Sequence, residues 1–227
     1  MKKNSKLRAS SVSVLLLFIL ALMVLRVNDA YAGPPLICHP LSIGNARSLP
    51  PGNGPFGTNR DYDRERLIEE TLDLLTSDMP IIVRMETLRR ATLYAAGINR
   101  GNDGWSKHSE EDRRIAYELL SRLMSRALSR ETLNKSEAMA WFDVGYLTEC
   151  YEQVGLAKGF AGYDFLKRAL SLRGEDPEIE FACAIVTLWP KRSEHNQHLQ
   201  KAKAGARDKS LLTTNIAIHF RNEKADQ

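Results

Sequence analysis

The chain has 227 residues, and 32 Lys and Arg against 28 Asp and Glu give it a net charge of +4. Its three cysteines are too few for a disulfide scaffold, so a hydrophobic core has to stabilise the fold. With 43% hydrophobic residues, a chain of this length can bury the core of one domain, or of two small ones, without crosslinks.

The first 32 residues have the three-part pattern of a secretory signal peptide. A basic start precedes an uninterrupted apolar run at residues 14–25, and the small-residue motif Ala30-Tyr31-Ala32 follows. The run is shorter than the roughly twenty residues that a membrane-spanning helix needs, and an uncleaved anchor is the alternative interpretation. We therefore expect export, cleavage near Ala32, a periplasmic or extracellular mature protein, and contact with the membrane only in transit.

The positive net charge belongs to this leader. The leader contains one acidic residue, Asp29, and cleavage of the whole leader would cancel the net charge of +4. The basic residues removed with it are Lys2, Lys3, Lys6, Arg8 and Arg26. A neutral mature domain gives no electrostatic support for nucleic-acid binding, so no nucleic-acid partner is expected.

Residues 33–60 are expected to form an irregular, Pro/Gly-rich arm. Proline lacks the amide that a helix interior needs and clashes with the preceding turn, so no helix is predicted here. Apolar residues such as Leu36 and Ile37 indicate that the arm lies on the domain rather than free. Residues 52–57 match G-x-G-x-x-G by letter, but no strand precedes them and Pro55 has no amide to donate, which favours a turn over a nucleotide site.

From residue 61 to the end, apolar residues recur at helical spacing, and no segment alternates with a period of two. This pattern predicts a single all-α domain of antiparallel helical hairpins, in a bundle or short solenoid, over residues 61–227. The predicted helices span residues 67–75, 80–97, 109–127, 134 or 136 to 155, 163–172, 177–189, 194–203 and 208–220.

Capping residues mark several of the predicted helix ends. Asp78 is the predicted cap of the second helix, and Gly97 is its predicted stop. Ser109 and Asp112 have the spacing of a capping box, and Asp208 is the predicted N-cap of the last helix. In the second helix we expect one buried stripe, which consists of Ile81, Met85, Leu88, Thr92 and Ala95.

Residues 138–188 resemble a degenerate tetratricopeptide repeat. Its W-x2-L-G spacing is carried by Trp141, Val144 and Gly145, and its A-x3-F-x2-A-L spacing by Gly162, Leu166, Ala169 and Leu170. Phe181 takes the place of Trp141 at the start of the next repeat. The spacing between these two residues is longer than the roughly 34 residues of one tetratricopeptide repeat. The resemblance implies stacked helical hairpins and, by analogy, binding of peptides or partner proteins. The leader followed by Gly-Pro-Pro-Leu-Ile-Cys also resembles the start of a group of exported bacterial proteins, which implies no activity.

A non-enzymatic role in protein or peptide binding is therefore expected, in a groove formed by helices within residues 110–190. Tyr146, Tyr151 and Tyr163 are the candidate anchors in this groove. The alternative is that these tyrosines only pack the core.

Charged residues, four of them arginines, recur at four-residue steps from the third predicted helix onward. They are Arg114, Glu118, Arg122, Arg126 and Arg130. Arg122 and Arg126 are candidate contacts for an acidic partner, and a solvated face with Arg–Glu pairing is the other interpretation.

Metal or enzymatic chemistry is the second hypothesis. His195 and His198 stand three apart on a predicted helix, but no third ligand accompanies them, so exposed histidines without a metal are expected. Cys38 and His39, together with one of these histidines, would be the reactive set of a small envelope enzyme or metal-dependent protein. A third hypothesis is a structural subunit whose arm docks on a neighbour. No cofactor motif is present, so no cofactor is expected.

Cys150 and Cys183 are predicted to lie in helix interiors as small hydrophobic residues. In the repeat register, they would lie about 10 Å apart along their helices, too far for a disulfide. Both are therefore expected to stay reduced.

Overall fold

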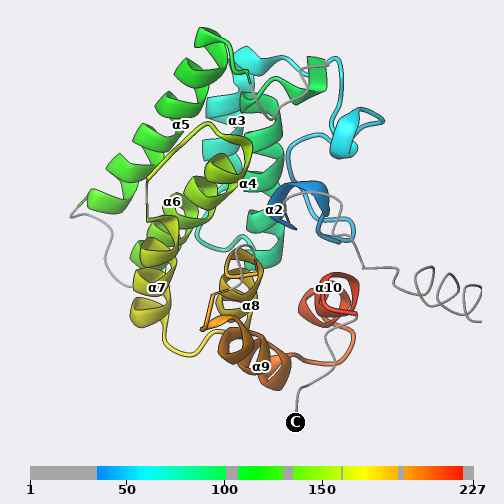
Figure 1. Ribbon diagram of the computed structural model, residues 1–227, viewed down its shortest axis with the longest axis vertical. Coiled ribbons are helices and arrows are strands. Elements are labelled where there is room, and N and C mark those ends of the chain that lie inside the picture. Colours follow the sequence, from blue (N-terminus) through cyan, green and yellow to red (C-terminus); the bar gives the residue numbers. More distant parts are fainter. Residues whose placement is uncertain (1–34, 101–106, 130–134, 160, 189–191, 222–227) are drawn as a thin grey trace, which may run out of the picture. The chain divides into compact units, whose positions relative to one another are not determined.

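The computed structural model describes residues 35–100, 107–129, 135–159, 161–188 and 192–221 (Figure 1). Within these ranges the fold is all-α, as predicted, and the only β pairing is one isolated bridge between Pro51 and Thr58. The predicted leader and its cleavage site lie outside the described residues. No helix in the described part of the chain is both long enough and apolar enough to cross a membrane.

Nine α-helices follow one another along the described residues. They are α2 (Pro35–Cys38), α3 (Leu67–Leu74), α4 (Ile81–Ala95), α5 (Glu110–Leu128), α6 (Lys135–Val154), α7 (Gly162–Arg173), α8 (Pro177–Val186), α9 (His195–Gly205) and α10 (Leu211–His219). Three single-turn 3-10 helices, at Pro55–Gly57, Arg64–Arg66 and Ile98–Arg100, lie between them. Each helix predicted from the periodicity is present, with its ends shifted by a few residues.

Two of the predicted helix boundaries are confirmed by their caps. Ser109 and Asp112 form a reciprocal capping box at the start of α5, and Gly97 follows α4 with a left-handed φ of 69°. The N-caps predicted for the starts of α4 and α10 are wrong. Pro80 rather than Asp78 precedes α4, and Ser210 rather than Asp208 caps α10. Lys209 has a φ of 60°, so no helix can run through it from Asp208.

Helix α4 is buried on all sides rather than along one stripe, which corrects the amphipathic prediction. It packs against α2, α3, α5, α6 and α8, and Figure 1 shows it among these helices. Its charged residues Arg84, Glu86, Arg89 and Arg90 are buried with the rest. These charges are compensated inside the protein, for example by the 2.7 Å ion pair between Arg84 and Asp143 on α6.

The arm lies on the helical domain, as expected, but it also contains a helix that was not expected. Pro35 stands at the first position of α2, where a missing amide has no consequence, so proline starts this helix rather than excluding it. Leu36 and Ile37 are buried beside α4, α6 and α8. Arg89 donates to the Ile37 carbonyl at 2.8 Å, and Glu86 accepts from the Leu41 amide at 3.0 Å.

Helices α6 and α7 form a closely packed pair, and α8 and α9 form another. Gly145 on α6 meets the start of α7 so tightly that a Cβ there would lie 2.7 Å from the Gly162 carbonyl oxygen. The two glycines of the repeat-like spacing thus mark the crossing point of α6 and α7. Membership of these hairpins in a tetratricopeptide-like repeat stays a prediction.

Candidate functional site

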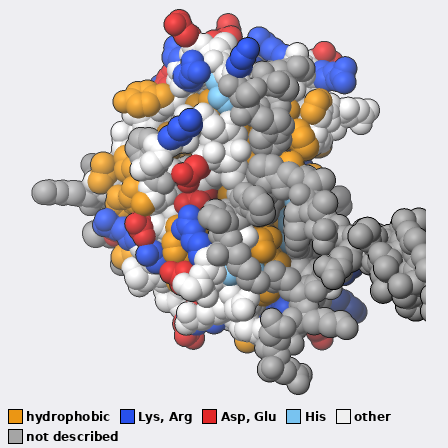
Figure 2. All heavy atoms as spheres, in the orientation of Figure 1, with side chains coloured by type: hydrophobic (Ala, Val, Ile, Leu, Met, Phe, Trp, Pro, Cys, Tyr) orange, Lys and Arg blue, Asp and Glu red, His pale blue; other side chains and the backbone are white. Residues whose placement is uncertain are grey.

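Helix α5 carries two apolar stripes, and only one of them faces the core. The predicted core face is confirmed, because Ile115, Leu119, Leu123 and Ala127 are buried. The second stripe is offset around the helix and consists of Tyr117, Leu120, Met124 and Leu128. Tyr117 is 77% exposed and Leu128 is 63% exposed. Figure 2 shows hydrophobic side chains at the surface on the left of the view, the side where α5 lies.

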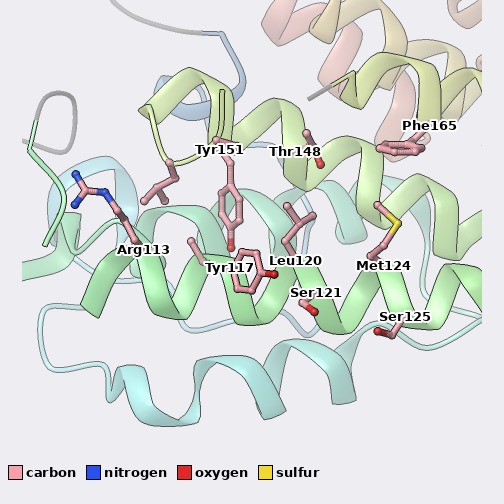
Figure 3. Close-up of a pocket in the computed structure, with 12 residues that line it drawn as sticks. Arg113, Tyr117, Leu120, Ser121, Met124, Ser125, Thr148, Tyr151 and Phe165 are labelled. Atoms are coloured by element: carbon pink, nitrogen blue, oxygen red, sulfur yellow. The ribbon is translucent and has the colours of Figure 1, made fainter. Parts of the chain in front are cut away.

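Tyr117, Leu120 and Met124 of the second stripe form one wall of a groove, which we call the α5–α6 groove (Figure 3). It has a cavity volume of about 390 Å³, and among the described residues that line it only Arg113 is charged. The remaining lining residues are Ala116, Tyr117, Leu120, Ser121, Met124 and Ser125 of α5, Thr148 and Tyr151 of α6, Leu156 and Ala157 of the following loop, and Phe165 of α7. The groove is therefore predominantly apolar, with few polar groups to orient a ligand.

Tyr151 provides a buried polar atom at the wall opposite α5. Its side chain is only 1% exposed, and in Figure 3 it extends from α6 toward α5. Its hydroxyl has no hydrogen-bond partner within the described structure. Leaving a buried hydroxyl unpaired destabilises a protein by about 1–3 kcal/mol, so a group that accepts a hydrogen bond from this atom would be stabilising.

The end of α6 is folded back so that the chain closes one end of the groove. Gly155 follows α6 with a φ of 76°, which only glycine adopts readily. The amides of Leu156 and Ala157 then donate to the Tyr151 carbonyl at 2.9 and 3.3 Å. This turn places both apolar side chains in the lining beside Tyr151.

The other end of the groove is an aromatic wall. Phe165 stacks on Trp141 with their ring centroids 5.4 Å apart, and the Arg168 guanidinium lies 4.0 Å from the centroid of Trp141. The close approach of α6 and α7 at Gly145 brings Phe165 to this position. In Figure 3, Phe165 and Met124 lie at the opposite end from Arg113.

The structure brings only one of the three candidate tyrosines into this groove. Tyr151 lines it, whereas Tyr146 is buried, stacks on Phe142 at 5.8 Å between centroids, and is absent from the lining. Five residues along a helix correspond to about 140° of rotation, so Tyr146 and Tyr151 cannot share one face. Tyr163 points toward α9, where its hydroxyl lies 2.6 Å from His198 Nε2.

Arg122 and Arg126 are turned toward α3 and do not line the groove. Arg122 forms ion pairs with Glu118 at 3.3 Å and Glu69 at 3.5 Å. Arg126 donates to the Leu75 carbonyl at 3.3 Å, at the end of α3. The pairing of arginine with glutamate that was expected for a solvated face is present, for example between Arg114 and Glu118. Arg130 lies outside the described residues.

His195 and His198 are buried, so the prediction of exposed histidines is wrong. His195 Nδ1 donates to the Ala184 carbonyl at 2.8 Å. His198 bridges three helices, with Nδ1 2.5 Å from Glu180 and Nε2 against Tyr163. Burial raises the pKa of Tyr163 to about 12, so its hydroxyl stays protonated. Within the described ranges, no group of three or more His, Cys, Asp or Glu residues is arranged to hold a metal ion.

Cys38 has the wrong environment for a nucleophile. Partial burial raises the pKa of its thiol, and the positive charge of Arg89 opposes this only in part, whereas reactive cysteines need a lowered pKa. His39 packs edge-on against His219, with the ring centroids 6.2 Å apart. Cys150 and Cys183 are buried free thiols, as predicted, and burial raises the pKa of both.

Tyr117, Leu120, Met124 and Phe165 are groove residues that the sequence analysis missed. The first three recur with Leu128 at steps of three and four residues, which is the spacing of a second apolar face on α5. That spacing was available in the sequence. The contribution of Phe165 depends on the packing of α7 against α6 and has no comparable pattern.

Comparison with protein-family models, with curated proteins and with solved structures gives no match.

Proposed function

We propose that this protein is an exported binding domain whose α5–α6 groove takes up an apolar helical segment of a partner protein. The observation that carries the proposal is the second apolar stripe of α5. It is largely exposed at Tyr117 and Leu128, and it borders a cavity lined by α6 and α7. An apolar face that a helix presents beside a groove is the usual receptor for an amphipathic helix.

The length of the stripe favours an elongated partner. Eleven residues separate Tyr117 from Leu128, which corresponds to about 16 Å, or three turns, along α5. A cavity of about 390 Å³ by itself would also suit a small molecule. Leu128, however, extends the apolar surface along α5 beyond the cavity lining, and a compact ligand would leave it uncovered.

The charges around the groove favour a partner with an acidic end. Arg114 and Arg122 are paired with Glu118 on α5, at 3.5 and 3.3 Å. Arg113, the only charged residue in the described part of the lining, is not part of these pairs and lies at one end of the groove (Figure 3). The resemblance of residues 138–188 to a tetratricopeptide repeat supports a binding role by analogy, and export rests on the leader.

The test starts from a library of helical peptides of about twelve residues, selected on the folded domain. Binding of one labelled peptide is then measured by fluorescence anisotropy for the wild type and for Tyr117→Glu. Because Tyr117 is mostly exposed, the fold should tolerate glutamate, whereas a bound apolar helix would bury its charge. We expect the Kd to increase at least tenfold.

Ile218→Glu is the matched control, because Ile218 is 52% exposed on α10 and does not line the groove. It should leave the Kd unchanged, and circular dichroism should show both variants folded. Equal effects of the two substitutions, or none from Tyr117→Glu, would contradict the proposal. A dimer in sedimentation equilibrium that Tyr117→Glu dissociates would instead show that a second copy of the chain occupies the groove.

A further inference from the structure

The buried hydroxyl of Tyr151 and the position of Arg113 identify a chemical group that the partner has to carry. We propose that the helix bound in the α5–α6 groove presents one carboxylate, from Asp or Glu, which accepts a hydrogen bond from the Tyr151 hydroxyl. This inference rests on the proposed function, because it names the group that the same groove recognises.

The first step of the argument is that the hydroxyl needs an acceptor. Tyr151 is 1% exposed, and its oxygen has no partner among the described residues, although the side chain lines the cavity. Burial raises the pKa of Tyr151, so the hydroxyl keeps its proton and donates rather than accepting as a phenolate. A wholly apolar ligand would enclose this donor and leave it unpaired.

The second step is that the acceptor is an anion rather than a neutral carbonyl. The backbone carbonyls of a helical ligand are already bonded within that helix, so a side chain has to supply the acceptor. Among the described residues of the lining, Arg113 is the only charged one, and its positive charge favours a carboxylate over a neutral acceptor. A hydrogen bond to a charged acceptor is also about twice as strong as a neutral one.

The decisive variant is Tyr151→Phe, which removes the oxygen and keeps the ring. Its two expected effects have opposite signs. The free protein should gain thermal stability, with Tm rising by about 2–4 °C, because an unpaired buried hydroxyl is deleted. The same substitution should weaken binding of the selected peptide about tenfold. Tyr146→Phe is the control on the same helix outside the groove, and it should leave the Kd unchanged.

Peptide selection supplies a second readout. Peptides selected on the wild type should share one Asp or Glu at a fixed position, and that preference should disappear from peptides selected on Tyr151→Phe. Replacing the shared residue by its amide should weaken binding to the wild type and have little effect on binding to Tyr151→Phe. This double-mutant cycle measures the coupling of the two groups directly.

Failure of this inference can be distinguished from failure of the proposed function. If Tyr117→Glu prevents binding but Tyr151→Phe leaves the Kd unchanged, the groove binds a helix, but the proposed hydrogen bond between a partner carboxylate and the Tyr151 hydroxyl is wrong. If Tyr151→Phe does not raise Tm, the hydroxyl has a partner in the free protein and the inference is overturned. If neither substitution changes binding, the groove is not the binding site.

Discussion

Single residues determine how the central helix α4 can be buried while carrying four charges. Burial opposes ionisation of Glu86, but hydrogen bonds and positive charge from Arg89 and Arg90 outweigh it, so the pKa of Glu86 is lowered. Arg84 contacts both carboxylate oxygens of Asp143, at 2.8 and 2.7 Å. Charges at these positions would normally predict a solvated face, so the sequence does not reveal that they are paired with one another or with α6.

The buried ion pair gives a prediction at this scale. Arg84→Met would leave Asp143 buried without its cation, and we expect it to lower the free energy of unfolding by about 3–5 kcal/mol. Urea denaturation followed by circular dichroism measures the change. Adding Asp143→Leu to this variant should restore much of the loss, because no buried charge then remains. A single variant as stable as the wild type would show that the pair does not compensate Asp143.

At the scale of the elements, helix positions were predictable and helix surroundings were not. Periodicity located the helices that follow the arm because it is a property of local sequence, whereas α2 and the N-caps of α4 and α10 were not predicted. The groove depends instead on which side of α5 and α6 the other helices leave open. Tyr146 and Tyr151 are chemically identical on one helix, and only their angular positions against the neighbouring helices place Tyr151 alone in the groove.

The crossing of α6 and α7 can be tested with one methyl group. In an unconstrained helix, Gly145→Ala would stabilise by about 0.5–1 kcal/mol. Here the added Cβ would lie 2.7 Å from the Gly162 carbonyl oxygen and push the helices apart, so a loss of about 1–3 kcal/mol is expected. Thermal unfolding measures the sign of the effect. A more stable variant would mean that α6 and α7 do not approach closely at this point.

On the scale of the whole molecule, the arm connects segments that are far apart in sequence. Asn215 on α10 accepts from the Ser42 amide and donates to the Ser42 carbonyl, both at 2.8 Å, across a separation of 173 residues. His39 of the arm packs against His219 near the same junction. The apolar residues of the arm indicated that it would lie on the domain, but the identity of its partners required the three-dimensional structure.

This junction makes stability dependent on pH. Burial lowers the pKa of His219 from 6.5 to about 4, with His39 and Arg89 adding to this effect and Glu86 opposing it. Below pH 6.5, the unfolded chain therefore binds this proton before the folded protein does. The stability contribution is fully present above pH 6.5 and is lost as the pH falls toward 4, by up to about 3 kcal/mol.

The measurement is urea unfolding of the wild type and His219→Gln at several pH values between 7 and 4.5. The wild type should lose more stability than the variant over this interval, because only the wild type carries the titrating ring. Parallel curves for the two proteins would contradict the lowered pKa.

The contacts of the arm with distant parts of the chain also bear on the order in which this protein folds. A chain that emerges with its amino end first delivers the arm before α4, α6 and α8, the helices that cover it, and delivers α10 last. The arm therefore has no stable location until nearly the whole sequence has emerged. Because such distant contacts are slow to form, the domain should complete folding in one late event, and until then its apolar segments stay accessible to chaperones and proteases.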